Sequence, residues 1–565
     1  MTPLRLVFLA LGILSSACIG FTSGGGSAAG GGASSGGGGA SSGGGSASSG
    51  GGSARSGGGS SDLDHPLTPG NPGTADVRLE VVSTQGRHAI SPLIYGTNQP
   101  ASPAMNRYGL QRMGGNRLTA YNWENNASNA GVDYIYENDG YLSGSATPGA
   151  AVTGALDSAR ASGAAAILTI PIVDFVAADK SPGGDVRNSA NYLDTRFKKN
   201  HAAKGSALSL NPDATDDVVY QDEFVNWVRA NANGVQVLFS LDNEPDLWFD
   251  THPEVHPDHV TYAELVSRTV TYASAVKATW PLVPVTGFVS YGWYGYVTLQ
   301  DAPDAQGDFT DYFLEELKAA GTSKGLRLID YLDLHWYPEA TGSGRITGTD
   351  TSSASIIARV QAPRSLWDPT YKETSWIENS LNEPIDLIPR MKAKIAAHYP
   401  GTKLAITEWN YGAGGHISGA VATADVLGVF GREEVGLGAY WKLNGAEPFA
   451  DAAFLAFRNY DGAGHGFGDT SLAATSSSAE LASIYASVDA ANPERTVLVV
   501  INKDTAAHSA ALTVAHPTRY SRVKVFTLTS AGSSLVPAPD VTAVDVNAFR
   551  YTMPALSVSV LVPTP

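Results

Sequence analysis

The chain has one cysteine, Cys18, in 565 residues, so an intramolecular disulfide is excluded. Its longest N-terminal apolar stretch, residues 6–14, is too short to span a bilayer. The sequence also lacks a nucleophile-elbow serine, a phosphate-cradling glycine loop and a dinucleotide-binding fingerprint. The Gly-Gly pairs near the N-terminus do not follow a strand. These absences argue against serine hydrolases of the elbow type and against nucleotide-dependent enzymes.

Charge is also scarce. Charged residues make up 16% of the chain, and 54 acidic residues outnumber 37 basic ones, which gives a net charge of −17. This excess argues against nucleic acid or an anionic membrane as a partner and suits a neutral polysaccharide, although it is equally explained by solubility alone. Hydrophobic residues make up 43% of the sequence, which is enough for a large core in two or three domains.

The N-terminus has the features of a signal peptide over residues 1–18. Arg5 precedes the apolar stretch, and small residues at 15–17 precede Cys18. This pattern predicts a bacterial lipoprotein with Cys18 as the lipidation site, although Ser15 stands where an aliphatic residue is commonest and ordinary secretion is the alternative. Residues 19–75 form a Gly/Ser-rich flexible linker. We therefore expect a secreted protein that contacts a membrane only through a lipid at Cys18.

Eight apolar, strand-like runs follow, most of them separated by helical or loop segments. They are residues 93–96, 117–123, 166–170, 237–241, 284–288, 331–337, 404–408 and 438–441. Helices are expected over residues 104–113, 222–232, 261–279 and 385–398. Strands that alternate with helices favour a parallel sheet, and eight such units predict an α/β fold with a closed (β/α)8 TIM-like barrel over residues 93–470.

The pattern changes after residue 470. Short strands without good helices between them predict an antiparallel β-sandwich over residues 471–565. The alternating strand near residues 77–82 is expected to join that sandwich, so residues 76–92 are assigned to it.

Two of the predicted barrel strands end in a glutamate. Residues 240–248 contain Asn243, Glu244 and a following proline, and residues 404–411 contain Glu408 next to aromatic residues. The carboxyl ends of barrel strands carry the chemistry of this fold, and a pair of carboxylates is the usual equipment for cleaving a glycosidic bond. We assign Glu244 as the general acid/base and Glu408 as the nucleophile. A carboxyl separation of about 5–5.5 Å would imply retention of anomeric configuration.

Other polar residues at strand ends each have two interpretations. Asn243 is a candidate for binding a sugar hydroxyl or for forming the turn before the proline. Tyr337 is a candidate donor to Glu408 or a rim aromatic. His335 could bind a sugar hydroxyl, donate to Glu408 or be a core histidine. Tryptophans at or near strand ends predict sugar-stacking subsites, with core packing as the alternative; they are Trp123, Trp248, Trp293, Trp336, Trp409 and Trp441.

A rival cluster could suggest a metal site. It consists of His252, Glu254, His256, Asp258 and His259. Its spacing matches no recognised zinc pattern, and the prolines at 253 and 257 interrupt any helix that could align the ligands.

Several of these segments together resemble glycoside hydrolase family 44. They are residues 90–98, 114–119, 121–126, 240–248, 333–338, 364–368 and 407–411. The resemblance implies a barrel with a β-sandwich and a retaining endo-β-1,4-glucanase, often most active on xyloglucan. It also implies Glu244 as acid/base and Glu408 as nucleophile. Some members of the family hold calcium, whose ligands cannot be placed from this sequence, and no other cofactor is expected.

We expect a monomer that acts on β-glucan polysaccharide. Two alternatives remain open: a xylanase or mannanase on the same barrel, and a non-catalytic carbohydrate-binding surface protein. The second has no need for both Glu244 and Glu408.

Overall fold

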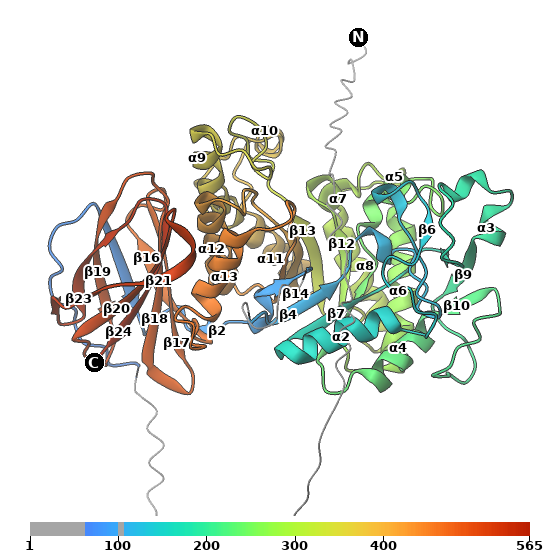
Figure 1. The fold of residues 1–565 in the computed structure, drawn as a ribbon, viewed down its shortest axis with the longest axis horizontal. Coiled ribbons are helices and arrows are strands. Elements are labelled where there is room, and N and C mark those ends of the chain that lie inside the picture. Colours follow the sequence, from blue (N-terminus) through green and yellow to red (C-terminus); the bar gives the residue numbers. More distant parts are fainter. Residues whose placement is uncertain (1–62, 100–106) are drawn as a thin grey trace, which may run out of the picture.

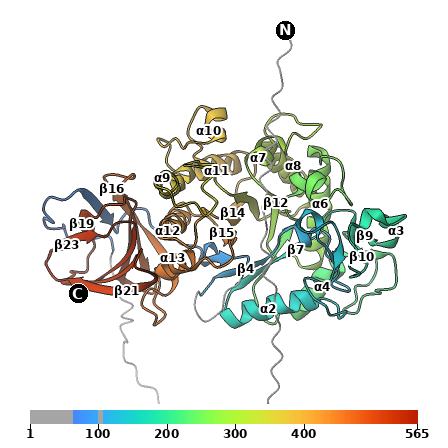
Figure 2. The same cartoon turned by 45° about the horizontal axis from the view of Figure 1, so that its top comes forward.

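The structure is a computed structural model that describes residues 63–99 and 107–565. A barrel and a β-sandwich lie side by side, and the turned view keeps α12 (Ile417–Arg432) and α13 (Pro448–Arg458) between them (Figures 1 and 2). The predicted signal peptide, Cys18 and most of the linker fall outside the described residues. Among the residues described, no helix is long and apolar enough to cross a membrane.

Eight parallel strands close into the predicted barrel, so the (β/α)8 fold class is confirmed. In chain order they are β3 (Gly96–Thr97), β4 (Leu110–Met113), β7 (Ala165–Ile170), β11 (Val237–Leu241), β12 (Val285–Ser290), β13 (Tyr331–Trp336), β14 (Lys403–Trp409) and β15 (Leu437–Tyr440). Most of these residues are buried, because the side chains inside the barrel pack on each other while helices cover the outside.

The second barrel strand was predicted in the wrong place. The strand is β4, inside the segment expected to be a helix, whereas residues 117–123 form the end of η2 (Asn116–Leu118) and a buried loop. Gly109 begins the correct strand by pairing with Tyr95, and Gly115 ends the segment at φ 95°, a conformation that suits glycine. The strand-like appearance of residues 117–123 reflects burial of the loop, since Leu118, Ala120 and Tyr121 lie in the core.

The helices follow the predicted alternation elsewhere. Those predicted at 222–232, 261–279 and 385–398 correspond to α4 (Gln221–Asn231), α6 (Tyr262–Thr279) and α11 (Leu387–His398). Other helices outside the barrel include α2 (Ala150–Ser162) and α8 (Phe309–Lys324). Three short helices follow the carboxyl ends of β11, β12 and β13 along the upper edge of Figure 1; they are α5 (Trp248–Thr251), α7 (Trp293–Thr298) and α10 (Trp376–Leu381). That edge is therefore the face of the barrel where chemistry is expected.

The sandwich combines the first strand of the described chain with the C-terminal ones. β1 (Val77–Val82) pairs antiparallel with β16 (Thr470–Ser476) and parallel with β19 (His508–Ala515). The remaining long strands are β17 (Ala482–Asp489), β18 (Asn492–Asn502), β20 (Arg522–Thr529), β21 (Gly532–Val541), β23 (Ala548–Met553) and β24 (Ser557–Thr564).

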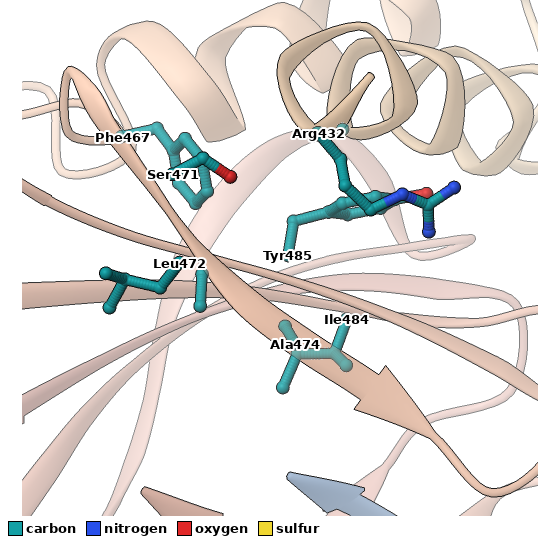
Figure 3. Close-up of a pocket in the computed structure, with 9 residues that line it drawn as sticks. Arg432, Phe467, Ser471, Leu472, Ala474, Ile484 and Tyr485 are labelled. Atoms are coloured by element: carbon teal, nitrogen blue, oxygen red, sulfur yellow. The ribbon is translucent and has the colours of Figure 1, made fainter. Parts of the chain in front are cut away.

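Helix α12 joins the two units, because its residues before Arg432 are buried between barrel and sandwich. Asp425 on this helix accepts from Tyr485 Oη at 2.7 Å and lies 2.8 Å from Lys503 Nζ, with the Asp425 and Lys503 side chains fully buried. Figure 3 shows the small cavity beside this contact, which Arg432 and Tyr485 line. Its volume of about 10 Å³ is no more than a water molecule needs, so it is not a sugar site.

Candidate active site

The barrel brings Glu244 and Glu408 together from the fourth and seventh strands. Glu244 follows β11 and opens η5 (Pro245–Leu247) at φ 45°, and Glu408 lies within β14. One carboxylate oxygen of each, together with a ring nitrogen of His335, all lie within 4.8 Å of one another. The two carboxylates therefore face the same small space, although 164 positions separate them in the sequence (408 − 244).

A buried aspartate fixes the turn that presents Glu244. Asp242 accepts from the Ile172 backbone N–H at 2.6 Å, the Thr119 hydroxyl at 2.6 Å and the Asn243 backbone N–H at 2.9 Å. Asp242 itself has φ 65°. Left-handed backbone at non-glycine residues costs free energy, and these hydrogen bonds hold the turn in that conformation.

Glu408 is held by a donor on each oxygen. Arg112 Nη1 donates to Oε1 at 2.7 Å, and Tyr337 Oη donates to Oε2 at 2.9 Å. The same guanidinium donates to Asn98 Oδ1 at 2.9 Å and to Asn243 Oδ1 at 2.8 Å. The Arg112 side chain is fully buried, so this fork fixes the nucleophile candidate and the residue before the acid candidate in one rigid arrangement.

Glu244 has a different environment. Burial raises its pKa to about 7, against the opposing charge of Arg112 and with a further contribution from Asp133. Its Oε1 lies 2.8 Å from His335 Nδ1. Burial lowers the pKa of His335 to about 4, so the imidazole is neutral near pH 7. Glu244 and Glu408 therefore lie in different environments, and two carboxyls in different environments can take different roles in one reaction.

Asn243 and Tyr337 both reach the site. Asn243 Oδ1 accepts from Arg112, and its Nδ2 donates to Asn116 Oδ1 at 3.3 Å. This amide therefore bridges the arginine to the loop after β4. Tyr337 takes the first of its two predicted roles, as a donor to Glu408.

The structure does not support sugar stacking by most of the predicted tryptophans. Trp123, Trp248, Trp336 and Trp409 are at most 2% exposed and Trp293 only 7%, so these rings belong to the packed interior. Trp123 stacks on Phe224, and Trp409 packs edge-on against Phe430 and Tyr440. These rings fill the space between strand ends and covering loops, the alternative that the sequence left open.

Other aromatic rings are accessible. Trp441 is half-buried, and its ring lies close enough to Gly115 that a Cβ there would clash at 2.8 Å. Tyr294 of α7 stacks on Trp376 of α10 with ring centroids 4.5 Å apart, and both rings are partly exposed.

The histidines predicted as rival metal ligands do not converge. His252 binds Glu254 at 2.8 Å, His256 binds Glu264 at 3.0 Å, and His259 faces the Gln300 carbonyl. In the described parts of the chain, the one close group of three or more potential ligand side chains is Glu244, His335 and Glu408. Because those groups already serve the paired-carboxylate arrangement, the calcium ion stays a prediction without assigned ligands.

Arg112 is the main site residue that sequence reasoning missed. It lies in the segment predicted as a helix, where its side chain could not be assigned to a barrel end. The signal that could have found it is a short run, Leu110–Met113, between Gly109 and the pair Gly114 and Gly115. Glycines on both sides are typical of a strand with tight turns rather than of a helix.

A closed (β/α)8 barrel with paired carboxylates at strands four and seven defines a glycoside hydrolase scaffold. Comparison with known proteins identifies the family. Residues 127–340 match the family model "Glycoside hydrolase family 44". The chain is 40% identical over 510 residues to Endoglucanase A of Paenibacillus lautus, covering 86% of this chain and 72% of that protein. It belongs to glycoside hydrolase family 44 and is a glycoside hydrolase.

Solved structures of the family have the same architecture. A xyloglucanase of family 44 from Paenibacillus polymyxa, solved with xyloglucan, superposes with a TM-score of 0.82 at 39% identity, covering 86% of this chain and 99% of that one. Cel44A, a family 44 endoglucanase from Clostridium thermocellum, superposes with a TM-score of 0.81 at 37% identity over the same shares. These matches support both the barrel and the sandwich.

Proposed function

We propose that this enzyme cleaves the β-1,4-glucan backbone of xyloglucan and related glucans at internal bonds, with retention of anomeric configuration. The observation that carries the proposal is the approach of the Glu244 and Glu408 carboxylates, with one oxygen of each lying within 4.8 Å of the other. Retaining glycosidases hold their carboxyls about 5–5.5 Å apart, whereas inverting enzymes leave room for a water molecule. The names of the relatives, an endoglucanase and a xyloglucanase, support a β-glucan as substrate.

In the first step, Glu408 attacks the anomeric carbon while Glu244 gives its proton to the leaving oxygen. The bond between that carbon and the leaving oxygen breaks, and a glycosyl ester forms on Glu408. Arg112 and Tyr337 keep the attacking carboxylate aligned. A pKa near 7 leaves Glu244 substantially protonated at neutral pH, as an acid must be.

In the second step, Glu244 takes a proton from water, which attacks the ester and releases the sugar. Glu244 must therefore donate in one half of the cycle and accept in the other. The imidazole of His335 contacts this carboxyl through Nδ1 at 2.8 Å and is neutral near pH 7, so it positions Glu244 without adding a charge in either half.

The test is hydrolysis by the purified enzyme of xyloglucan, carboxymethylcellulose, xylan and mannan, with Glu244→Gln and Glu408→Gln as variants. We expect reducing-sugar release on the glucans, lost in both variants, and a fast drop in viscosity that marks internal cleavage. Proton NMR of the first product should show the β-anomer. Activity confined to xylan or mannan, or an α-anomer as first product, would contradict the proposal.

We also propose that the enzyme is secreted and anchored by a lipid at Cys18, a residue outside the described part of the chain. The support is the order of charged, apolar and small residues before Cys18 and the Gly/Ser linker after it. Fractionation of cells that express the full chain should place it in the membrane pellet, and Cys18→Ala should release it. An unchanged distribution of the variant would contradict the anchor.

A further inference from the structure

The segment Val132–Tyr136, between β4 and α2, presents an unusual apolar surface. Val132 is 46% exposed, Tyr134 54% and Ile135 50%. Throughout residues 63–99 and 107–565, no other stretch of five residues exposes three large apolar side chains to this degree. Adjacent exposed apolar side chains on a soluble protein often mark a binding site.

The backbone of this segment is strained at the same point. Ile135 has φ 43° and Tyr136 has φ 55°. A β-branched residue in the left-handed region is an outlier, because its side chain crowds the backbone. Ile135 is exposed, so burial in a core does not offset this cost, and such uncompensated strain is typical of functional surfaces.

The segment is fixed to the part of the chain that carries Glu244. Gly131, at φ 53°, lies against α5 so closely that a Cβ would come within 2.5 Å of the Thr251 carbonyl and 2.6 Å of the His252 ring. His252 Nε2 contacts the Asn116 carbonyl at 2.8 Å, and Asn116 Nδ2 donates to Asp133 Oδ1 at 2.9 Å. These contacts hold the exposed side chains in place beside the active site.

The contacts continue into the catalytic centre. Asn116 accepts from Asn243, the residue before Glu244. Asp133 is also among the charges that influence Glu244. Two hydrogen bonds through Asn116 therefore connect the segment to the residue before Glu244. The fully buried His252–Glu254 pair, rejected above as a metal site, instead supports this connection.

We propose that Val132, Tyr134 and Ile135 form a subsite for the glucan chain, beyond the two sugars joined by the scissile bond. The proposal rests on the proposed function. A neutral glucan suits this surface, because its sugar rings have apolar faces for Tyr134 and Ile135 and hydroxyl groups for the Tyr134 Oη. The contacts of Gly131 and Asp133 hold the segment in one conformation before binding, which reduces the conformational entropy lost when the glucan chain binds.

The test compares Tyr134→Ala and Ile135→Ala with the wild type on xyloglucan and on cello-oligosaccharides from cellotriose to cellohexaose. We expect each variant to lower kcat/KM on the polymer by about fivefold to twentyfold, mainly through KM, and to leave the shortest substrates that are cleaved within about twofold. In a Glu408→Gln background, Tyr134→Ala should weaken xyloglucan binding by the same factor in calorimetry.

Leu282→Ala is the matched control for Ile135→Ala. Leu282 is 91% exposed and precedes β12, at the opposite end of the barrel from the active site. It should leave kcat/KM unchanged at every chain length. Variants of Tyr134 and Ile135 that match the wild type on all substrates, or that lose activity equally on short and long ones, would overturn the subsite. A wild type that cleaves no glucan would instead contradict the proposed function, and the calorimetric comparison would still decide the subsite.

Discussion

Replacing Arg112 should test the arrangement of the active site most directly. Its guanidinium contacts Glu408 at 2.7 Å and Asn243 at 2.8 Å, with the side chain fully buried. In Arg112→Met the Glu408 carboxylate keeps only the Tyr337 donor and loses its positive partner. In Arg112→Lys the charge remains, but a single ammonium cannot reproduce the planar fork that spans two acceptors.

The size of the effect follows from these contacts. Removing one partner of a buried ion pair costs about 3–5 kcal/mol, because the other charge stays buried. If between half and all of that cost is lost from the stabilisation of the transition state, kcat/KM drops by about 10- to 5000-fold in Arg112→Met, since each 1.36 kcal/mol is a factor of ten. Arg112→Lys should lose less, about 10- to 100-fold, because a charged hydrogen bond contributes about 1.5–3 kcal/mol.

Initial rates on xyloglucan at fixed pH measure both variants, with melting temperatures beside them. The matched control is Arg359→Met, which removes another fully buried arginine whose donors bind the Ile346, Tyr411 and Asp350 carbonyls and the Ser418 hydroxyl. That variant should lower stability but keep kcat/KM well below its melting temperature. An Arg112→Met enzyme that stays folded and works within about threefold of the wild type would refute the reasoning.

Three further outcomes are expected. The kcat/KM profile should fall as pH rises through about 7, because Glu244 must be protonated and burial raises its pKa to that value. Asp133→Asn should move this alkaline limb of the profile to lower pH, since it removes a negative charge that raises the pKa of Glu244. An unmoved limb would exclude the effect of Asp133 on Glu244. Tyr337→Phe should lower kcat by about 10- to 100-fold in single-turnover rates through loss of one charged hydrogen bond, and a fully active variant would remove Tyr337 from the mechanism. Lys503→Met should lower the free energy of unfolding by about 3–5 kcal/mol in denaturant unfolding, and adding Asp425→Asn should recover part of that loss. A Lys503→Met variant as stable as the wild type would mean that the buried pair does not hold the two units together.

Most of the fold could be predicted from the sequence, because parallel barrel strands are buried on both faces and form continuous apolar runs. The run Val237–Leu241 is buried throughout and has Ser240 as its one polar residue, and the chemistry begins at the charged residues after it. β4 was predicted as part of a helix because it lacks such a continuous apolar run. It has only four residues, two of them Gln111 and Arg112, and such a run cannot be told from a helical turn by periodicity.

The same contrast explains the site. Glu244 and Glu408 could be predicted because each is a glutamate at or just after the end of a buried strand. Their partners depend on contacts between distant segments: Arg112 reaches Glu408 across 296 positions, which no local pattern encodes. The tryptophans could not be assigned from the sequence, because a position at a strand end does not say which way the ring faces. Trp409 turns into the core beside Phe430, while Glu408, one residue earlier, faces the active site.

His335 connects these observations to the chemistry. Its Nδ1 lies 2.8 Å from Glu244 and 3.6 Å from Glu408, while no protein group among the described residues binds its Nε2. The neutral ring carries one proton, and moving it between the two nitrogens would need a donor or acceptor at Nε2. The Nδ1 contact therefore holds the Glu244 carboxyl in place, and the imidazole, with a pKa near 4, adds no charge in either step of the proposed mechanism.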